Sequence, residues 1–171
     1  MFTRAAAPFV CAVVVVLFAY FTGNSFALEE GKAFTLSRAL SQVQLFAGLT
    51  NAERDALKSA AKLRQGKAGE RIIRQGETLD RMFIILESEA EVQVNGRHVV
   101  TLSGQPLVGE IEFLDKHPAA ADVLLLKDSD LIELNYAALT VLMENQPRIG
   151  YVLTREIAKI EARRLRKTTS E

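Results

Sequence analysis

Residues 108–123 read Val108-Gly109-Glu110-Ile111-Glu112-Phe113-Leu114-Asp115-Lys116-His117-Pro118-Ala119-Ala120-Ala121-Asp122-Val123. Gly109 permits a backbone conformation that is closed to residues with side chains, so it predicts a tight turn. We expect one short helix after this turn, then a loop marked by Pro118, and then an apolar strand. The first amides of such a helix point outward without partners inside the helix. The segment is therefore a candidate anion-binding turn.

Short strand-like segments flank this turn on both sides. They are Leu63–Lys67, Arg71–Arg74, Arg81–Leu86, Ala90–Val94, Arg97–Leu102, Ala121–Leu126 and Asp130–Leu134. The dipeptide Asn95-Gly96 is the strongest local signal in the chain, because both residues tolerate the positive φ angles of a two-residue hairpin. Strands of this length and spacing predict a β-sandwich or a jelly-roll-like barrel.

Helices are expected before and after the strands. They are a weak helix at Ser37–Phe46, one from Thr50 to about Ala61, one from Asn135 to about Asn145, and a last one at Arg148–Lys167. Thr50 and Glu53 have the spacing of a capping box, in which each side chain accepts from the other residue's backbone N–H. Asn135 is a favoured helix cap, and Pro147 suits the first turn of the last helix.

Several motifs together resemble the cyclic nucleotide-binding domain family. The segment from Gly109 to Val123 fits, without a gap, the family's phosphate-binding cassette, which is roughly Gly-Glu-Leu-Ala-Leu, a short loop and Pro-Arg-Ala-Ala-Thr-Val. The other matching motifs occur in the family's order: Leu45-Phe46-Ala47-Gly48-Leu49, Ala68-Gly69-Glu70, Gln75-Gly76-Glu77 and Asp80-Arg81-Met82-Phe83-Ile84-Ile85-Leu86. The resemblance covers about residues 45–166.

The resemblance implies a mainly β fold with flanking helices. Residues 45–134 would form a double-stranded β-helix, or jelly-roll β-barrel, with its N-terminal helix, and residues 135–171 a C-terminal helix pair with a basic tail. The family's transcription factors have a helix-turn-helix after this pair. No residues remain for one here, so DNA binding is not expected.

The sequence departs from the family pattern at three positions. Ala119 stands where the family's arginine pairs with the cyclic phosphate, Glu112 stands at a small-residue position, and Ser88 replaces a glycine. Without the arginine, the cassette loses the bidentate, charge-assisted bonds that hold a phosphate. We therefore expect the family fold with a remodelled pocket, and no bound cofactor, cyclic nucleotide being possible but disfavoured.

The resemblance also implies where the pocket lies. Its ligand-pocket residues are Gly109, Glu110, Ile111, Glu112, Ala119, Ala120 and Ala121. Glu110 matches the family's acid that accepts a ribose hydroxyl, and its alternative role is to cap the short helix or bond neighbouring amides. Lys116 and His117 are possible substitutes for the missing arginine, although such loop charges are more often solvated.

The last predicted helix carries an apolar stripe opposite a basic face. The stripe consists of Ile149, Val152, Leu153, Ile157 and Ile160, and the basic residues are Arg155, Lys159, Arg163, Arg164, Arg166 and Lys167. In the family this helix packs on the pocket or on a second subunit. We therefore expect the stripe to pack on one of these two surfaces. The cations suit the end of a helix, or they form a docking surface for an acidic partner or lipid headgroups.

Residues 1–27 have the pattern of a signal peptide. Arg4 supplies a short positive segment, Pro8–Phe21 is an uncharged run, and Ser25 and Ala27 fit a cleavage site after Ala27. Cleavage would release the protein to the periplasm. The alternative is an uncleaved inner-membrane anchor at residues 8–28, with residues 28–44 as a linker and weak helix. Export weakens cyclic nucleotide sensing, because cyclic nucleotides are signals of the cytosol.

The composition argues against several classes of function. The chain has 171 residues, of which 49% are hydrophobic, and its 21 Lys and Arg balance its 21 Asp and Glu. This balance provides no field that would recruit nucleic acid. Cys11 is the sole cysteine, His98 has no ligand partner at metal spacing, and no serine lies in a nucleophile elbow.

Three functional hypotheses follow. The leading one is a non-enzymatic ligand-sensing or protein-interaction module, of bacterial type, that is exported or tethered to the membrane. The second is a genuine cAMP- or cGMP-binding regulatory protein. The third is a structural subunit of a membrane complex, anchored by residues 8–28 and docking to a protein partner, or to itself, through its last helix.

Overall fold

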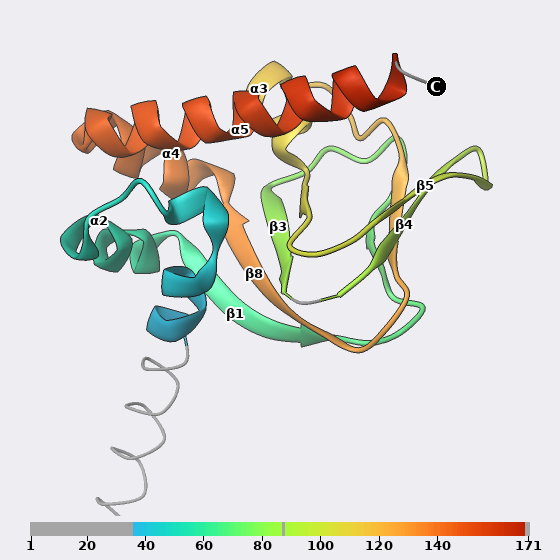
Figure 1. Cartoon of the computed structure of the whole chain (residues 1–171), viewed down its shortest axis with the longest axis horizontal. Coiled ribbons are helices and arrows are strands. Elements are labelled where there is room, and N and C mark those ends of the chain that lie inside the picture. The colour runs from blue at the N-terminus through green and yellow to red at the C-terminus, as the bar shows by residue number, and fades with distance from the viewer. Residues whose placement is uncertain (1–35, 87, 170–171) are drawn as a thin grey trace, which may run out of the picture. The chain divides into compact units, whose positions relative to one another are not determined.

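The computed structural model describes residues 36–86 and 88–169. The predicted signal peptide or anchor and the first part of the linker lie outside these residues. The described part is one compact unit in which two antiparallel sheets form a roll and the helices gather on one side of it (Figure 1). The predicted mainly β, jelly-roll-like architecture is confirmed.

Each sheet has four strands. The first sheet has the order β1 (Ala61–Gly66), β8 (Ser129–Asn135), β3 (Arg81–Leu86), β6 (Leu107–Val108), and the second has the order β2 (Arg71–Ile73), β7 (Asp122–Leu125), β4 (Ala90–Val94), β5 (Arg97–Leu102). All pairings are antiparallel. The predicted bounds of β3, β4 and β5 match the structure. The hairpin between β4 and β5 turns at Asn95 and Gly96, whose φ angles are +52° and +71°.

The helices also follow the predicted order. Residues 36–42 are helical, and they precede η1 (Gln44–Phe46), α2 (Asn51–Ala56), η2 (Leu57–Ser59), α3 (Glu110–Asp115), α4 (Tyr136–Asn145) and α5 (Pro147–Thr168). The capping box forms, since Thr50 Oγ1 accepts from the Glu53 amide at 3.3 Å and Glu53 Oε2 accepts from the Thr50 amide at 2.8 Å. The helix predicted to reach Ala61 ends earlier, at Ala56, and continues as one 3₁₀ turn.

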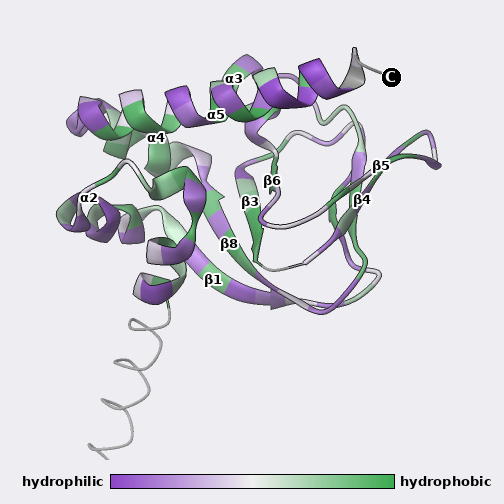
Figure 2. Ribbon diagram, viewed as in Figure 1, coloured by the Kyte–Doolittle hydropathy of each residue, from purple (hydrophilic) through white to green (hydrophobic). Residues whose placement is uncertain are grey.

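The hydrophobic core lies on both faces of the sheet that contains β3 and β8. One face packs Met82, Ile84 and Ile132 against the helices, and the opposite face packs Phe83 and Ile85 into the interior of the roll. This alternation along β3 is the period-two pattern of a strand buried on both sides. Figure 2 shows apolar residues along the strands and on the inward side of α5.

The apolar stripe of α5 belongs to this core. Ile149, Val152, Leu153 and Ile157 are between 0% and 4% exposed, and Ile160 packs against the same cluster. The stripe therefore covers its own domain and is not an exposed face for a second subunit, so a partner of α5 would meet its outward side. Within the described residues, no helix combines the length and hydropathy needed to cross a membrane.

Candidate functional site

The cassette begins at Gly109, whose φ of +85° closes the turn between β6 and α3. A Cβ atom at this position would lie 3.1 Å from Met82 Cα and 3.2 Å from the Arg81 carbonyl oxygen. The Tyr136 hydroxyl donates a hydrogen bond to the Gly109 carbonyl, and the Phe113 and Tyr136 rings lie 5.2 Å apart. The turn is thus held against β3 and α4, and the tight turn predicted at Gly109 is confirmed by its positive φ.

Ala119 packs inside the roll. Its side chain is 3% exposed and belongs to the same cluster as Phe83 and Val108. Its carbonyl accepts from the Gly76 amide at 2.8 Å, and its amide donates to the Glu77 carbonyl at 2.9 Å. The position that corresponds to the family's arginine is therefore a buried methyl group. The backbone N–H and C=O of this residue are both hydrogen-bonded to the turn after β2.

Glu110 makes a contact that the sequence did not predict. It is 1% exposed, and its Oε1 accepts from the Arg164 guanidinium of α5. Arg164 also donates to Glu161 at 2.8 Å and to the Leu107 carbonyl at 2.6 Å. The residue that matches the ribose-binding acid is thus paired with a cation of the chain's own last helix.

Burial sets the ionisation of this site. Removal from water raises the pKa of Glu110 above its usual range, although Arg164 pulls it the other way. Glu110 Oε2 is buried and accepts no hydrogen bond from the described residues. Burial and the nearby acids Glu112 and Glu110 also raise the pKa of Tyr136, so this hydroxyl stays a donor at neutral pH.

Glu112, the acid that departs from the family pattern, contacts the loop after α3. Its Oε1 accepts from the Ala120 amide at 3.2 Å. Ala121, the next residue in the sequence, is half-buried. Ile111 is 46% exposed. Ile111 therefore faces solvent and does not line the predicted pocket.

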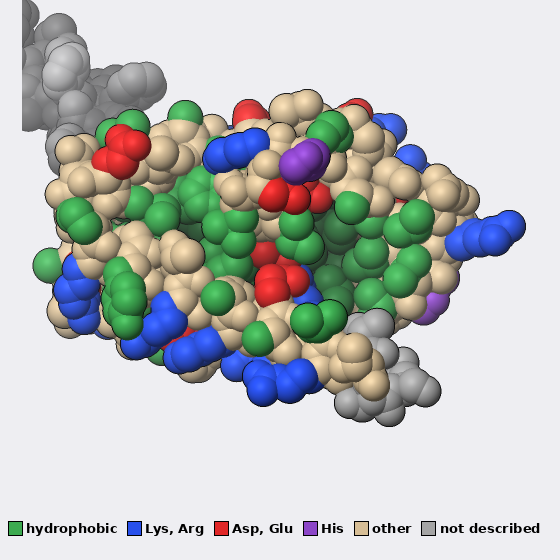
Figure 3. Space-filling model, turned by 90° about the horizontal axis from the view of Figure 1, so that it is seen from above, with side chains coloured by type: hydrophobic (Ala, Val, Ile, Leu, Met, Phe, Trp, Pro, Cys, Tyr) green, Lys and Arg blue, Asp and Glu red, His purple; other side chains and the backbone are tan. Residues whose placement is uncertain are grey.

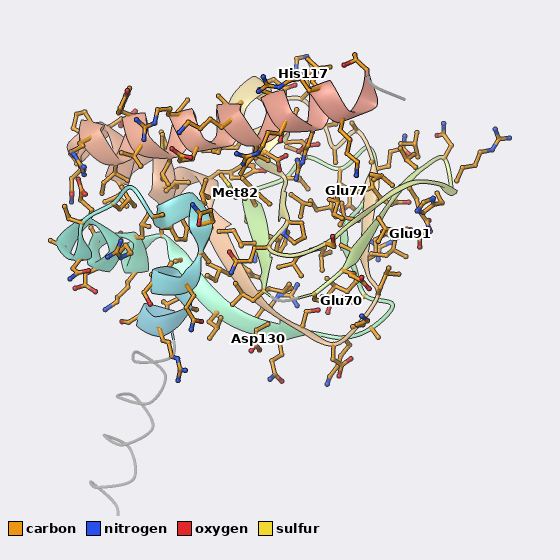
Figure 4. All side chains as sticks on the ribbon, viewed as in Figure 1. Glu70, Glu77, Met82, Glu91, His117 and Asp130 are labelled. Atoms are coloured by element: carbon orange, nitrogen blue, oxygen red, sulfur yellow. The ribbon has the colours of Figure 1, made fainter. Side chains whose placement is uncertain are left out.

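Lys116 and His117, the predicted substitutes for the arginine, have other neighbours. Lys116 Nζ lies 4.7 Å from the centre of the Phe113 ring. The His117 side chain is 79% exposed and lies 3.5 Å from Asp115. Figure 4 places His117 at the outer edge of the molecule, well separated from Glu77 on the turn that holds Ala119. Both side chains lie on the outside of α3, as solvated loop residues do.

A surface groove includes the same arginine in its lining. The groove encloses about 430 Å³, and its walls include Ile84, Leu107, Ile160 and Arg164. Seen from the side that carries α3 and α5, the molecule has a hollow with acidic side chains at its centre and a row of Lys and Arg along one border (Figure 3). Among residues 36–86 and 88–169, no three His, Cys, Asp or Glu are grouped to hold a metal ion.

Sequence reasoning missed Arg164 as a site residue. It was grouped with the exposed cations of the last helix, for which the helix dipole is a sufficient explanation. A signal was present, because Arg164 lies four residues after Ile160 and so continues the apolar stripe. A cation on the buried side of an amphipathic helix predicts a buried acid opposite it.

Comparisons with known proteins agree with this architecture. Residues 63–146 match the family model described as the cyclic nucleotide-binding domain. The Pycsar effector protein XpPycTIR of Xanthomonas perforans is 33% identical over 112 residues, which are 65% of this chain and 36% of that protein. A cAMP-dependent protein kinase regulatory subunit of Mycosarcoma maydis is 40% identical over 88 residues, which are 49% of this chain and 17% of that protein.

Solved structures show the same fold. A cyclic nucleotide-binding domain from Methylobacillus flagellatus superposes with a TM-score of 0.69 at 20% identity, covering 81% of this chain and 80% of the other. The Thermus thermophilus Catabolite Activator Protein superposes with a TM-score of 0.60 at 24% identity, covering 73% of this chain and 59% of the other. Over residues 63–146, the chain therefore belongs to the cyclic nucleotide-binding domain family.

Proposed function

We propose that this chain is a non-enzymatic regulatory module whose cassette holds its C-terminal helix in place of a cyclic nucleotide. The observation that carries the proposal is the pairing of Glu110 with Arg164. One oxygen of the buried Glu110 carboxylate already accepts from a guanidinium, which leaves Oε2 as the single acceptor for a ribose hydroxyl. With Ala119 in the arginine position, the bidentate contact to the phosphate is missing, and the contact of the acid is reduced to one oxygen.

The module would then act by binding a protein and not by catalysing a reaction. On α5, the side chains of Tyr151 and Leu165 are 64% and 66% exposed, on a helix whose inward stripe is buried. Aromatic and large apolar side chains at the surface are typical of protein interaction sites. A protein partner, or a second copy, would meet this outward side of α5.

Calorimetric titration of the chain with cAMP and with cGMP tests the proposal. We expect no saturable heat at nucleotide concentrations that saturate a cAMP-dependent protein kinase regulatory subunit titrated under the same conditions. Tight binding of either nucleotide would contradict the proposal. The control subunit shows that the ligand and the instrument can report binding.

A genuine cyclic nucleotide receptor is the second candidate. It is supported by a relative that is named a cAMP-dependent protein kinase regulatory subunit and is 40% identical over the matched residues. Because the match covers 17% of that protein, its activity and partners are not carried over to this chain. Such a receptor would need Lys116 or His117 to swing toward the cassette, so Lys116→Ala would weaken nucleotide binding markedly.

Export or membrane tethering is a separate proposal, supported by the sequence of residues 1–27. Intact mass, N-terminal sequencing and cell fractionation of the protein from a bacterial host distinguish the cases. A mature N-terminus at Leu28 in the periplasm supports an exported module. A full-length chain in the membrane supports the third candidate, a structural subunit anchored by residues 8–28. A full-length chain in the cytosol contradicts both.

A further inference from the structure

The loop between α3 and β7 supplies its own backbone N–H groups with acceptors. The His117 amide donates to Asp115 Oδ1 at 3.0 Å. The Ala119 amide donates to the Glu77 carbonyl at 2.9 Å. The residue between them is a proline and has no N–H. Of the backbone N–H groups of residues 117–120, only the Ala120 amide is not accounted for by these contacts.

That donor, the Ala120 amide, is met by the acid that departs from the family pattern. Glu112 Oε1 accepts from it at 3.2 Å. A carboxylate supplies both the negative charge and the acceptor oxygen that an anionic ligand would bring to a backbone N–H. We infer that Glu112 is the built-in anion of this cassette and sets its specificity, so that the site excludes phosphate and carboxylate ligands. This inference rests on the proposed function and names the residue responsible.

The contact is favoured because it is local. Glu112 and Ala120 are eight residues apart, and both belong to the α3 turn and its loop. An acceptor that is tethered so close competes with a free ligand as if it were at high concentration. The amide is therefore engaged before any small anion arrives.

Charge in the cassette acts in the same direction. Glu110 and Glu112 both lie in the first turn of α3. The nearby guanidinium of Arg164 already contacts Glu110 and Glu161. An incoming phosphate would thus approach a carboxylate at contact distance, which selects against anions by like-charge repulsion. Ligands without phosphate or carboxylate, such as uncharged small molecules, meet no such barrier.

The test is a titration of the ¹⁵N-labelled full chain with inorganic phosphate at constant ionic strength, following the Ala120 amide resonance. Glu112→Ala frees this amide and removes the charge. We expect phosphate to shift the resonance in this variant with an affinity at least about tenfold above that of the wild type. Asp115→Ala is the matched control, because it removes an acid from the same helix whose partner is the His117 amide.

Glu112→Gln provides a second variant that keeps the shape of the side chain. It removes the charge but retains an oxygen that can accept from Ala120, so we expect a smaller gain than in Glu112→Ala. Phosphate affinity equal to the wild type in both Glu112 variants, or an equal gain in Asp115→Ala, would overturn the inference. These outcomes are distinct from failure of the proposed function, which would appear as cyclic nucleotide binding by the wild type.

Discussion

At the scale of single residues, Gly109 carries the tightest steric constraint in the cassette. Its φ is +85°, and a Cβ atom there would lie 3.1 Å from Met82 Cα and 3.2 Å from the Arg81 carbonyl oxygen, so the backbone of β3 would have to shift. Gly104 has nearly the same backbone angle, +84°, but a Cβ atom there would meet nothing within 4 Å. The two glycines therefore separate the cost of backbone strain from the cost of a steric clash.

We predict that Gly109→Ala lowers the free energy of unfolding by about 2 kcal/mol or more, through strain and clash together. Gly104→Ala should cost about 1 kcal/mol, through backbone strain alone. Urea denaturation of both variants checks this difference. Equal losses would show that the contact with Met82 and Arg81 relaxes without cost.

Glu110 links the site to pH. Its pKa is raised by burial above the ordinary value of 4.5, so the folded state holds a proton that the unfolded state has already released. The free energy of unfolding therefore contains a contribution that falls as pH rises from about 4.5 toward neutrality. Glu110→Gln cannot ionise and should lose this decline. Denaturation as a function of pH measures it, with Glu144→Gln, an exposed acid of α4, as the control.

At the scale of elements, α5 shows both how far the sequence pattern reaches and where it stops. The 3.6-residue period identified the stripe from Ile149 to Ile160 correctly, because burial on one helix face repeats along the chain. The partner of that stripe could not be read from the pattern, since the packing surface comes from distant segments. The pairing of Arg164 with Glu110 spans 54 residues and depends on how α5 crosses α3.

This pairing makes Arg164 the anchor of the second half of α5. Arg164→Ala leaves the buried Glu110 without its cation and should cost about 2–3 kcal/mol at pH 8. It should also speed amide hydrogen exchange near the C-terminal end of α5. Arg163→Ala, at an exposed neighbouring position, should stay within about 0.5 kcal/mol of the wild type. Equal effects of the two substitutions would contradict the anchoring role.

The strands divide in the same way. β3, β4 and β5 were predicted to the residue because Gly-marked turns bound them and Asn95-Gly96 sets their hairpin. β6 was missed because it has two residues, too few for any periodicity to be detected. Its pairing with β3 depends on tertiary contacts. That short pairing places Gly109 at the start of α3, so the missed strand matters for the site.

At the scale of the whole molecule, a sequence pattern was enough for the architecture but not for the state of the site. The absence of the arginine can be read from the sequence at Ala119, and the prediction of a remodelled pocket was based on it. That the Ala120 amide is taken by Glu112 is a matter of loop geometry, which depends on the bonds between Ala119 and the turn at Gly76 and Glu77. The bonds of Ala119 to Gly76 and Glu77 join segments more than forty residues apart.

Within the described residues, 36–86 and 88–169, two core clusters join the sheets to the helices. We therefore predict that a chain lacking residues 1–35 unfolds in one cooperative transition with the same midpoint as the full chain. Thermal denaturation followed by circular dichroism compares the two. A lower midpoint or a second transition in the shorter chain would mean that the first residues contribute to the core.

The central claim is that two contacts from the chain's own side chains occupy the cassette of this cyclic nucleotide-binding domain, Arg164 on Glu110 and Glu112 on the Ala120 amide. The most direct test is the ¹H–¹⁵N spectrum of the wild-type chain at increasing cAMP concentration, read at residues 109–121. The account predicts that these resonances stay in place up to concentrations that saturate a nucleotide-binding relative. A saturable shift of the Gly109, Glu110 and Ala120 amides would contradict it.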